Sequence, residues 1–222
     1  MTHQELKQLN YVSKNPRIKI IPEFLQKGAI FIHIPKTAGT TFDWVLSALA
    51  VRLNLKRKRM AGTIYKQFLG HGKEDNTGIW EEKNIDDYDR FSWISGHFPF
   101  CKNLRDTSGR INLTLVREPL ARSRSQYFYG LHKGGWDRKT SLEKVYETGG
   151  MIDNLQVRQL AGCTDPAQVC DRKMLIAALK NINELFDIIG LVSEFDFFLS
   201  TFISLFNLPD IAYVSSQVGS KK

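Results

Sequence analysis

The chain has 222 residues, 42% of them hydrophobic, and a formal net charge of +8 at pH 7. This length suits one sizeable domain and is short for two, and the apolar fraction is that of a globular protein with a core. No apolar run reaches the roughly 18 to 20 residues of a membrane helix, and the polar N-terminus lacks the apolar centre of a signal peptide, so a soluble, cytoplasmic protein is predicted.

The positive charge is partly local, in the run RLNLKRKR from Arg52 to Arg59. This run is either a solvated basic helix end or a site for an anionic partner. It is accompanied by neither interleaved aromatic residues nor zinc-ligand spacing, so no nucleic-acid partner is predicted. The cysteines Cys101, Cys163 and Cys170 have no metal-ligand spacing, and we expect reduced thiols and no metal site.

In chain order, residues 1–28 read as a weakly structured lead-in, and residues 29–222 read as a single domain. Apolar runs predict strands at 29–34, 91–95, 111–116 and 186–192. Helical spacing and breakers predict helices at 40–53, 119–129, 141–147, 152–160, 171–181 and 194–208. The last residues, VSSQVGSKK, form no obvious closing element, as in a chain truncated at its C-terminus. Strands that alternate with helices predict an α/β fold with a mainly parallel sheet and helices on both faces.

The first predicted strand runs through HIPKTAGTTF directly into a helix. A tight loop in this position directs backbone N–H groups and the positive end of the helix dipole at one point, which suits an anion. Lys36 adds a charge, and Gly39 lets the backbone approach the ligand closely. The loop is not a Walker A motif, because its lysine precedes the glycine, so an ATPase is disfavoured.

A second motif, VREPLARSRSQYFY, follows the strand predicted at 111–116. Arg117 at the strand end and Ser125 on the next helix can grip one phosphate from two sides. The alternative is an ion pair between Arg117 and Glu118, with a serine that faces solvent.

Together the two motifs resemble the sulfotransferase superfamily, and most closely the carbohydrate sulfotransferases of the heparan sulfate 2-O and 6-O type (sulfotransferase family 2). The resemblance implies a P-loop-NTPase-like fold and 3'-phosphoadenosine 5'-phosphosulfate (PAPS) as sulfuryl donor, with 3',5'-ADP as product and no metal required. It assigns Arg117 and Ser125 to the donor's 3'-phosphate. It assigns the 5'-phosphosulfate to the loop residues Lys36, Thr37, Ala38, Gly39, Thr40 and Thr41.

A histidine after the second predicted strand, His97 in ISGHFPF, is the predicted catalytic base, because related enzymes carry a base in this region and imidazole titrates near neutral pH. The alternative is a histidine satisfied within a loop. His33 is expected to be structural, and His71 and His132 are the next candidates for the base.

The resemblance also suggests residues that contact the acceptor, namely Tyr129, Trp136, Gln156 and Arg158. Trp136 could instead plug a core edge, and the last two could be ordinary helix surface. The expected reaction is in-line transfer of a sulfuryl group to a hydroxyl of a carbohydrate, with His97 taking the proton and Lys36 neutralising the leaving oxygen. The alternatives are a P-loop-like nucleotide kinase and a non-catalytic module that binds anions or glycans.

Overall fold

The computed structural model describes residues 28–52, 56–60, 93–100, 110–165 and 167–205. They contain a five-stranded sheet in the order β2-β3-β1-β4-β5, and every pair of neighbouring strands is parallel. The strands are β1 (Ala29–Ile32), β2 (Arg57–Met60), β3 (Trp93–Gly96), β4 (Ile111–Val116) and β5 (Ile188–Leu191). The helices are α3 (Gly39–Arg52), α6 (Pro119–His132), α7 (Leu142–Glu147), α8 (Leu155–Ala161), α9 (Arg172–Glu184), the short 3₁₀ helix η4 (Val192–Glu194) and α10 (Phe195–Leu205).

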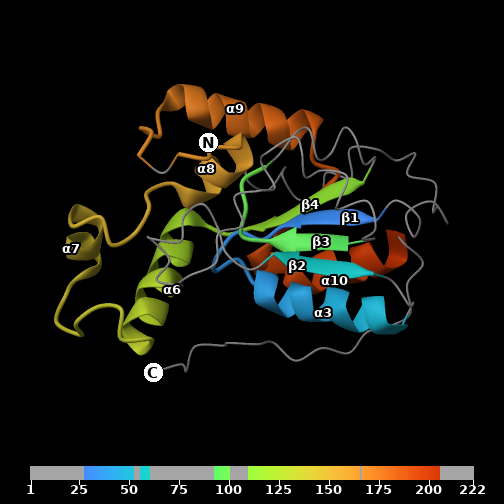
Figure 1. Ribbon diagram of the computed structural model, residues 1–222, viewed down its shortest axis with the longest axis horizontal. Coiled ribbons are helices and arrows are strands. Elements are labelled where there is room, and N and C mark those ends of the chain that lie inside the picture. The colour runs from blue at the N-terminus through green and yellow to red at the C-terminus, as the bar shows by residue number, and fades with distance from the viewer. Residues whose placement is uncertain (1–27, 53–55, 61–92, 101–109, 166, 206–222) are drawn as a thin grey trace.

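Both faces of the sheet are covered by helices, as Figure 1 shows. Successive side chains of a strand point to opposite faces. Phe31 of β1 accordingly packs in a cluster with residues of α3 and α10, whereas Ile30 and Ile32 belong to a second cluster with residues of α8 and α9. The predicted α/β fold with a parallel sheet between two helical layers is confirmed.

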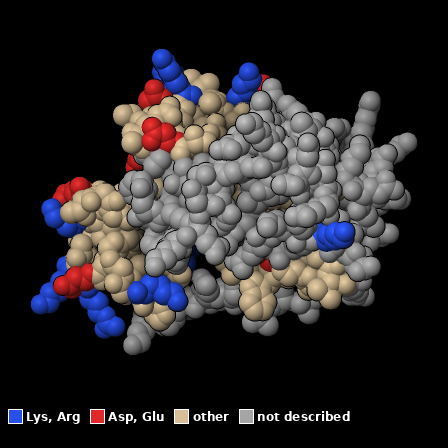
Figure 2. All heavy atoms as spheres, viewed as in Figure 1, with Lys and Arg blue, Asp and Glu red and all other residues tan. Residues whose placement is uncertain are grey.

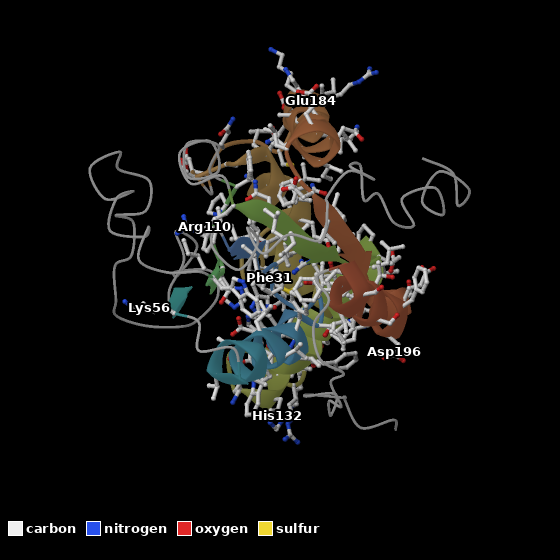
Figure 3. The ribbon with its side chains drawn as sticks, turned by 90° about the vertical axis from the view of Figure 1, so that its right-hand side faces the viewer. Phe31, Lys56, Arg110, His132, Glu184 and Asp196 are labelled. Carbon is white, nitrogen blue, oxygen red and sulfur yellow. The ribbon has the colours of Figure 1, made fainter. Side chains whose placement is uncertain are left out.

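The first of these clusters is built around aromatic rings. Phe31 is fully buried, and its ring meets Phe42 of α3 edge-on at 4.9 Å between centroids. Phe42 in turn lies 5.0 Å from Phe198 and 5.1 Å from Phe202, both on α10. Figure 3 shows Phe31 at the centre of the molecule, between the sheet and these helices. Each buried ring contributes about 1.5 to 3 kcal/mol, so this cluster fixes α3, and with it the loop before α3, against the sheet.

Part of the basic run is a strand rather than a helix end. Residues Arg57–Met60 form β2, which pairs with β3 alone and is therefore the edge of the sheet. Charged side chains are common on edge strands because they discourage pairing with another chain. The interpretation of the whole run as a solvated helix end is therefore wrong for residues 57–59, which belong both to the run and to β2.

The fold brings three predicted motifs to one edge of the sheet. β1 lies between β3 and β4, and Ile32 is level with both Gly96 and Thr114, so these strands end close together. In Figure 1 the strands point toward α6 and α8, which stand at this edge. In open parallel sheets ligands bind outside the carboxyl ends of the strands. Within the described ranges, no helix is long and apolar enough to cross a membrane.

Candidate functional site

The loop between β1 and α3 is held open by two strained residues. Lys36 has φ +69° and Ala38 has φ +58°, a region that costs a residue with a side chain about 1 to 3 kcal/mol. Thr37 is buried, and its hydroxyl donates to the Ile34 carbonyl at 2.8 Å. Within the described part of the chain, the backbone N–H groups of residues 36–40 have no acceptor. The loop therefore presents a cradle of free donors at the N-terminus of α3, which is suited to an anion.

Gly39 lets a histidine ring lie against the start of α3. A Cβ at this position would lie 2.1 Å from the His33 ring, closer than any real contact. His33 is buried, and its ring stacks on Phe31 at 5.5 Å. The glycine thus allows close packing inside the protein, and the burial of His33 is consistent with the structural role expected for it.

The Lys36 ammonium lies over an aromatic ring of α6. Its Nζ is 4.1 Å from the centroid of the Tyr129 ring, a cation–π contact. Burial, and then repulsion from Arg117, lower the pKa of Lys36 below its ordinary value. No carboxylate of a described residue pairs with this ammonium. Lys36 is therefore a partly buried cation with no anionic partner in the described protein.

Arg117 is the first residue after β4, and it reaches the lysine loop. Its Nη1 donates to the Lys36 carbonyl at 3.3 Å, across 81 residues of sequence. Its backbone is held by the Gln156 amide, which accepts from the Arg117 N–H at 2.9 Å and donates to the Arg117 carbonyl at 2.8 Å. The alternative for this arginine is an ion pair with Glu118; among the described residues the hydrogen bonds of the Glu118 carboxylate go instead to backbone N–H groups of the next helix.

That carboxylate caps α6. Glu118 accepts from the N–H groups of Leu120 at 2.8 Å and Ala121 at 2.6 Å, and these bonds lower the pKa of Glu118. Pro119 occupies the first helical position, where its missing N–H costs nothing. The helix therefore starts at a defined residue, two positions after Arg117.

The buried side of α6 carries a third cation. Arg122 is 3% exposed, bonds the Tyr146 hydroxyl, and keeps its Nη1 without an acceptor among the described residues. Burial lowers the pKa of Arg122, and the nearby charge of Arg117 lowers it further. Lys36, Arg117 and Arg122 form what we call the cation cluster. Arg122 was not among the residues predicted from the sequence, since nothing in the motif distinguishes it from its exposed neighbour Arg124.

Ser125 lies on α6 between Arg122 and Tyr129, and it is half-buried. Exposed cations continue along the outer part of α6 and the loop after it, at Arg124, Lys133, Arg138 and Lys139. Figure 2 shows Lys and Arg side chains projecting from this part of the surface. The electrostatic potential here favours the approach of an anion.

His97 follows β3, and its ring is oriented by a backbone group. The ring Nδ1 lies 2.7 Å from the His33 carbonyl oxygen, and the two imidazole centroids are 4.2 Å apart. A carbonyl can only accept, so in the neutral ring Nδ1 carries the hydrogen and the basic lone pair is on Nε2. This tautomer is the one that a general base acting through Nε2 needs.

Two other predicted residues have local partners. Arg158 is buried and paired with Asp153 at 2.6 Å, and it also donates to the Gln168 carbonyl at 2.6 Å. Trp136 packs against Gly130 and stacks on Tyr127, with 6.0 Å between ring centroids. These contacts tie Arg158 to the segments before and after its own helix and Trp136 to α6, and none of them joins either residue to the cation cluster.

The remaining histidines and cysteines lie away from this edge or outside the described residues. His132 is exposed at the last residue of α6, at the bottom of Figure 3. His71 and Cys101 fall outside the described residues, whereas Cys163 and Cys170 are free thiols. No group of three or more His, Cys, Asp or Glu side chains gathers within the described ranges. A hollow lined by Val192–Phe197 contains none of the predicted site residues.

Comparisons with known proteins assign no family to this chain. No protein-family model matches this chain, and no curated protein matches it.

Proposed function

We propose that this protein is a sulfotransferase that moves a sulfuryl group from PAPS to a hydroxyl, with a carbohydrate as the acceptor. The observation that carries the proposal is the meeting of the two motifs: Arg117 donates to the backbone of Lys36 at 3.3 Å. The two side chains belong to different strand ends and share no carboxylate partner among the described residues. Two adjacent cations beside a cradle of free N–H groups suit a donor that carries several negative charges.

The donor's two anionic ends have separate partners in this proposal. The N–H groups of residues 36–40 hold the 5'-phosphosulfate at the start of α3, and Thr40 and Thr41 add hydroxyls. Arg117 binds the 3'-phosphate from the end of β4, together with Ser125 from α6. The Gln156 amide bonds only the Arg117 backbone, and one guanidinium nitrogen, Nη1, donates to the Lys36 carbonyl, so the remaining N–H groups of the guanidinium are assigned to this contact.

The protein residues then promote an in-line displacement. His97 takes the acceptor hydroxyl's proton on Nε2 while the acceptor oxygen forms a bond to sulfur. The bond between sulfur and the bridging oxygen of the 5'-phosphate breaks, and 3',5'-ADP leaves. Lys36 neutralises the charge that grows on the bridging oxygen, which lowers the barrier most where water is excluded.

Sugar binding is assigned to aromatic side chains near this edge. Tyr129 contacts Lys36 directly, so an acceptor bound beside that ring would lie near the reacting group. Trp136 offers a further ring for stacking on a sugar, at the far end of α6.

Ligand-induced stabilisation tests the donor. We expect 3',5'-ADP to raise the melting temperature clearly more than ATP with magnesium at equal concentration, because only the former has a 3'-phosphate for Arg117. Equal shifts, or a larger one with ATP and magnesium, would favour a nucleotide kinase. Incubation with labelled PAPS and a panel of acceptor extracts then tests transfer. Binding of PAPS without transfer to any extract would favour a non-catalytic module.

A matched variant tests the 3'-phosphate site. Arg117→Ala should weaken 3',5'-ADP binding by about 1.5 to 3 kcal/mol, the range for hydrogen bonds to charged groups. It should leave adenosine 5'-phosphosulfate, which lacks the 3'-phosphate, nearly unaffected. An equal loss for both ligands would contradict the assigned role of Arg117.

A further inference from the structure

The residue after β4 has its backbone groups satisfied by a side chain. Arg117 lies beyond the last residue of β4, so strand pairing does not account for its N–H and carbonyl. The Gln156 amide bonds both of them, at 2.9 Å and 2.8 Å, in the way a neighbouring strand would. A side-chain amide carries a carbonyl acceptor and an NH₂ donor side by side, so it can bond the N–H and the carbonyl of one residue at once.

The helix that carries this amide is itself firmly anchored. The Gln159 carbonyl of α8 accepts from the Phe100 N–H at 2.7 Å, just beyond His97 on the β3 side. Arg158 of α8 reaches back to the residue two positions before the helix: it donates to the Asp153 carbonyl at 2.9 Å and to the Asp153 carboxylate at 2.6 Å. On its outer side, Asn181 of α9 donates to the Leu160 carbonyl at 2.9 Å. Gln156 therefore acts from a fixed position on the sheet.

We propose that Gln156 is a positioning residue that holds the Arg117 guanidinium in place for the 3'-phosphate of the donor. This inference rests on the proposed function, and it replaces the expectation that Gln156 contacts the acceptor. Arg117 has a long, flexible side chain, and its usefulness in a bidentate contact depends on where its Cα lies. Without the Gln156 amide, the backbone at Arg117 can shift, and the guanidinium is then no longer held in the position and orientation that a bidentate contact with the phosphate requires.

The test measures discrimination for the 3'-phosphate, which a merely structural residue would not alter. Dissociation constants of 3',5'-ADP and 5'-AMP are measured by calorimetry, and their ratio reports the contribution of that phosphate. Gln156→Met keeps the volume and removes both hydrogen bonds. We expect it to reduce the preference for 3',5'-ADP about tenfold, within the range found for residues of one hydrogen-bond network. The double variant with Arg117→Ala should lose no more than Arg117→Ala alone.

Asn181→Leu is the matched control. It removes a hydrogen bond from another side-chain amide to a backbone carbonyl that also involves α8, but the carbonyl is that of Leu160 and not that of Arg117. We expect a lower melting temperature and an unchanged ratio. If Gln156→Met fails to fold, Gln156→Asn, which only draws the amide back by one methylene, carries the same test.

The outcomes separate this inference from the proposed function. A wild-type protein with no preference for 3',5'-ADP over 5'-AMP overturns both. A preference that Arg117→Ala removes and Gln156→Met leaves intact overturns the positioning role alone. Equal weakening of both ligands by Gln156→Met also overturns it, since that pattern means general damage to the fold.

Discussion

The imidazole of His97 is oriented by the backbone of His33: its Nδ1 lies 2.7 Å from the His33 carbonyl oxygen. The two residues are 64 positions apart in sequence and follow adjacent parallel strands. Because the carbonyl is part of the loop that leads to Lys36, the predicted base and the predicted anion loop share one rigid connection. A displacement of the Lys36 loop would therefore move the His97 ring, and a displacement of the ring would move the loop.

His97→Asn separates the base from the structural bond. The Asn amide can still donate to the His33 carbonyl, but it has no Nε2 that could accept a proton. We expect sulfuryl transfer to fall by about 10² to 10⁴, the usual contribution of a general base, with 3',5'-ADP affinity and melting temperature nearly unchanged. Transfer, binding and melting are measured on one preparation. A folded variant with the wild-type transfer rate would exclude His97 and move the test to His132.

Gly39→Ala should disturb the packing of His33 against His97, because residue 39 contacts the His33 ring. The new Cβ would lie 2.1 Å from the His33 ring, which already stacks near His97. Overpacking of this kind costs about 1 to 3 kcal/mol, so we expect a melting temperature lower by several degrees, and a loss of transfer larger than the loss of folded protein. Gly135→Ala, where a Cβ meets only an ordinary contact at 3.5 Å, is the control. Wild-type stability and activity in Gly39→Ala would mean that the His33 ring has room to move.

Lys36→Met should stabilise the unliganded protein and impair its function. The folded-state pKa of Lys36 is lowered, so at neutral pH the folded protein bears a charge it disfavours. The unfolded chain binds this proton more tightly, so the cost is full below the folded pKa and fades as pH rises toward 10.5. Urea unfolding should show a more stable variant at pH 7, with the gain shrinking in alkaline buffer. Affinity for 3',5'-ADP should fall by about 1.5 to 3 kcal/mol.

The control for this prediction is Lys56→Met, which neutralises an exposed lysine at the start of β2. It should alter neither stability nor 3',5'-ADP binding appreciably. If Lys36→Met destabilises the protein at pH 7, the lysine contributes to the fold, and its interpretation as an unpartnered functional cation is wrong.

Glu118→Ala tests the cap that starts α6. Loss of a side-chain cap costs about 1 kcal/mol. The hydrogen bonds to Leu120 and Ala121 lower the pKa of Glu118, so the stability it contributes is complete above 4.5 and is lost as pH falls through the lower folded-state value. Chemical unfolding at pH 7 should show the difference from wild type, which should vanish in strong acid. Glu184→Ala, which removes an exposed carboxylate at the end of α9, is the control and should leave the stability at pH 7 nearly unchanged. A constant difference at all pH values would mean that the carboxylate charge is irrelevant.

The local pattern of the sequence determined most of the fold. Apolar runs with β-branched residues located β1, β3, β4 and β5, and breakers such as Pro119 located the starts of helices, because these signals act within a few residues. Other helix boundaries moved by up to three residues, since residues such as Ser141 and Asp171, predicted to lie inside helices, cap them instead, and capping depends on side-chain geometry. The strand β2 was missed because RKRM has no apolar alternation, and only its pairing with β3 makes it a strand.

For the candidate site, too, local features could be predicted from the sequence, whereas contacts between distant segments could not. The lysine loop could be predicted because a strand, a turn and a helix follow each other directly in the chain. What only the tertiary structure decided are the contacts between distant segments: Arg117 on the Lys36 carbonyl, Lys36 on the Tyr129 ring, and the Gln156 amide on the Arg117 backbone. Side chains of one type look alike in sequence whether they face solvent, a ligand or a backbone group. Which of these a glutamine or an arginine meets depends on how the strands order themselves in the sheet, and that order is set by packing of the whole core.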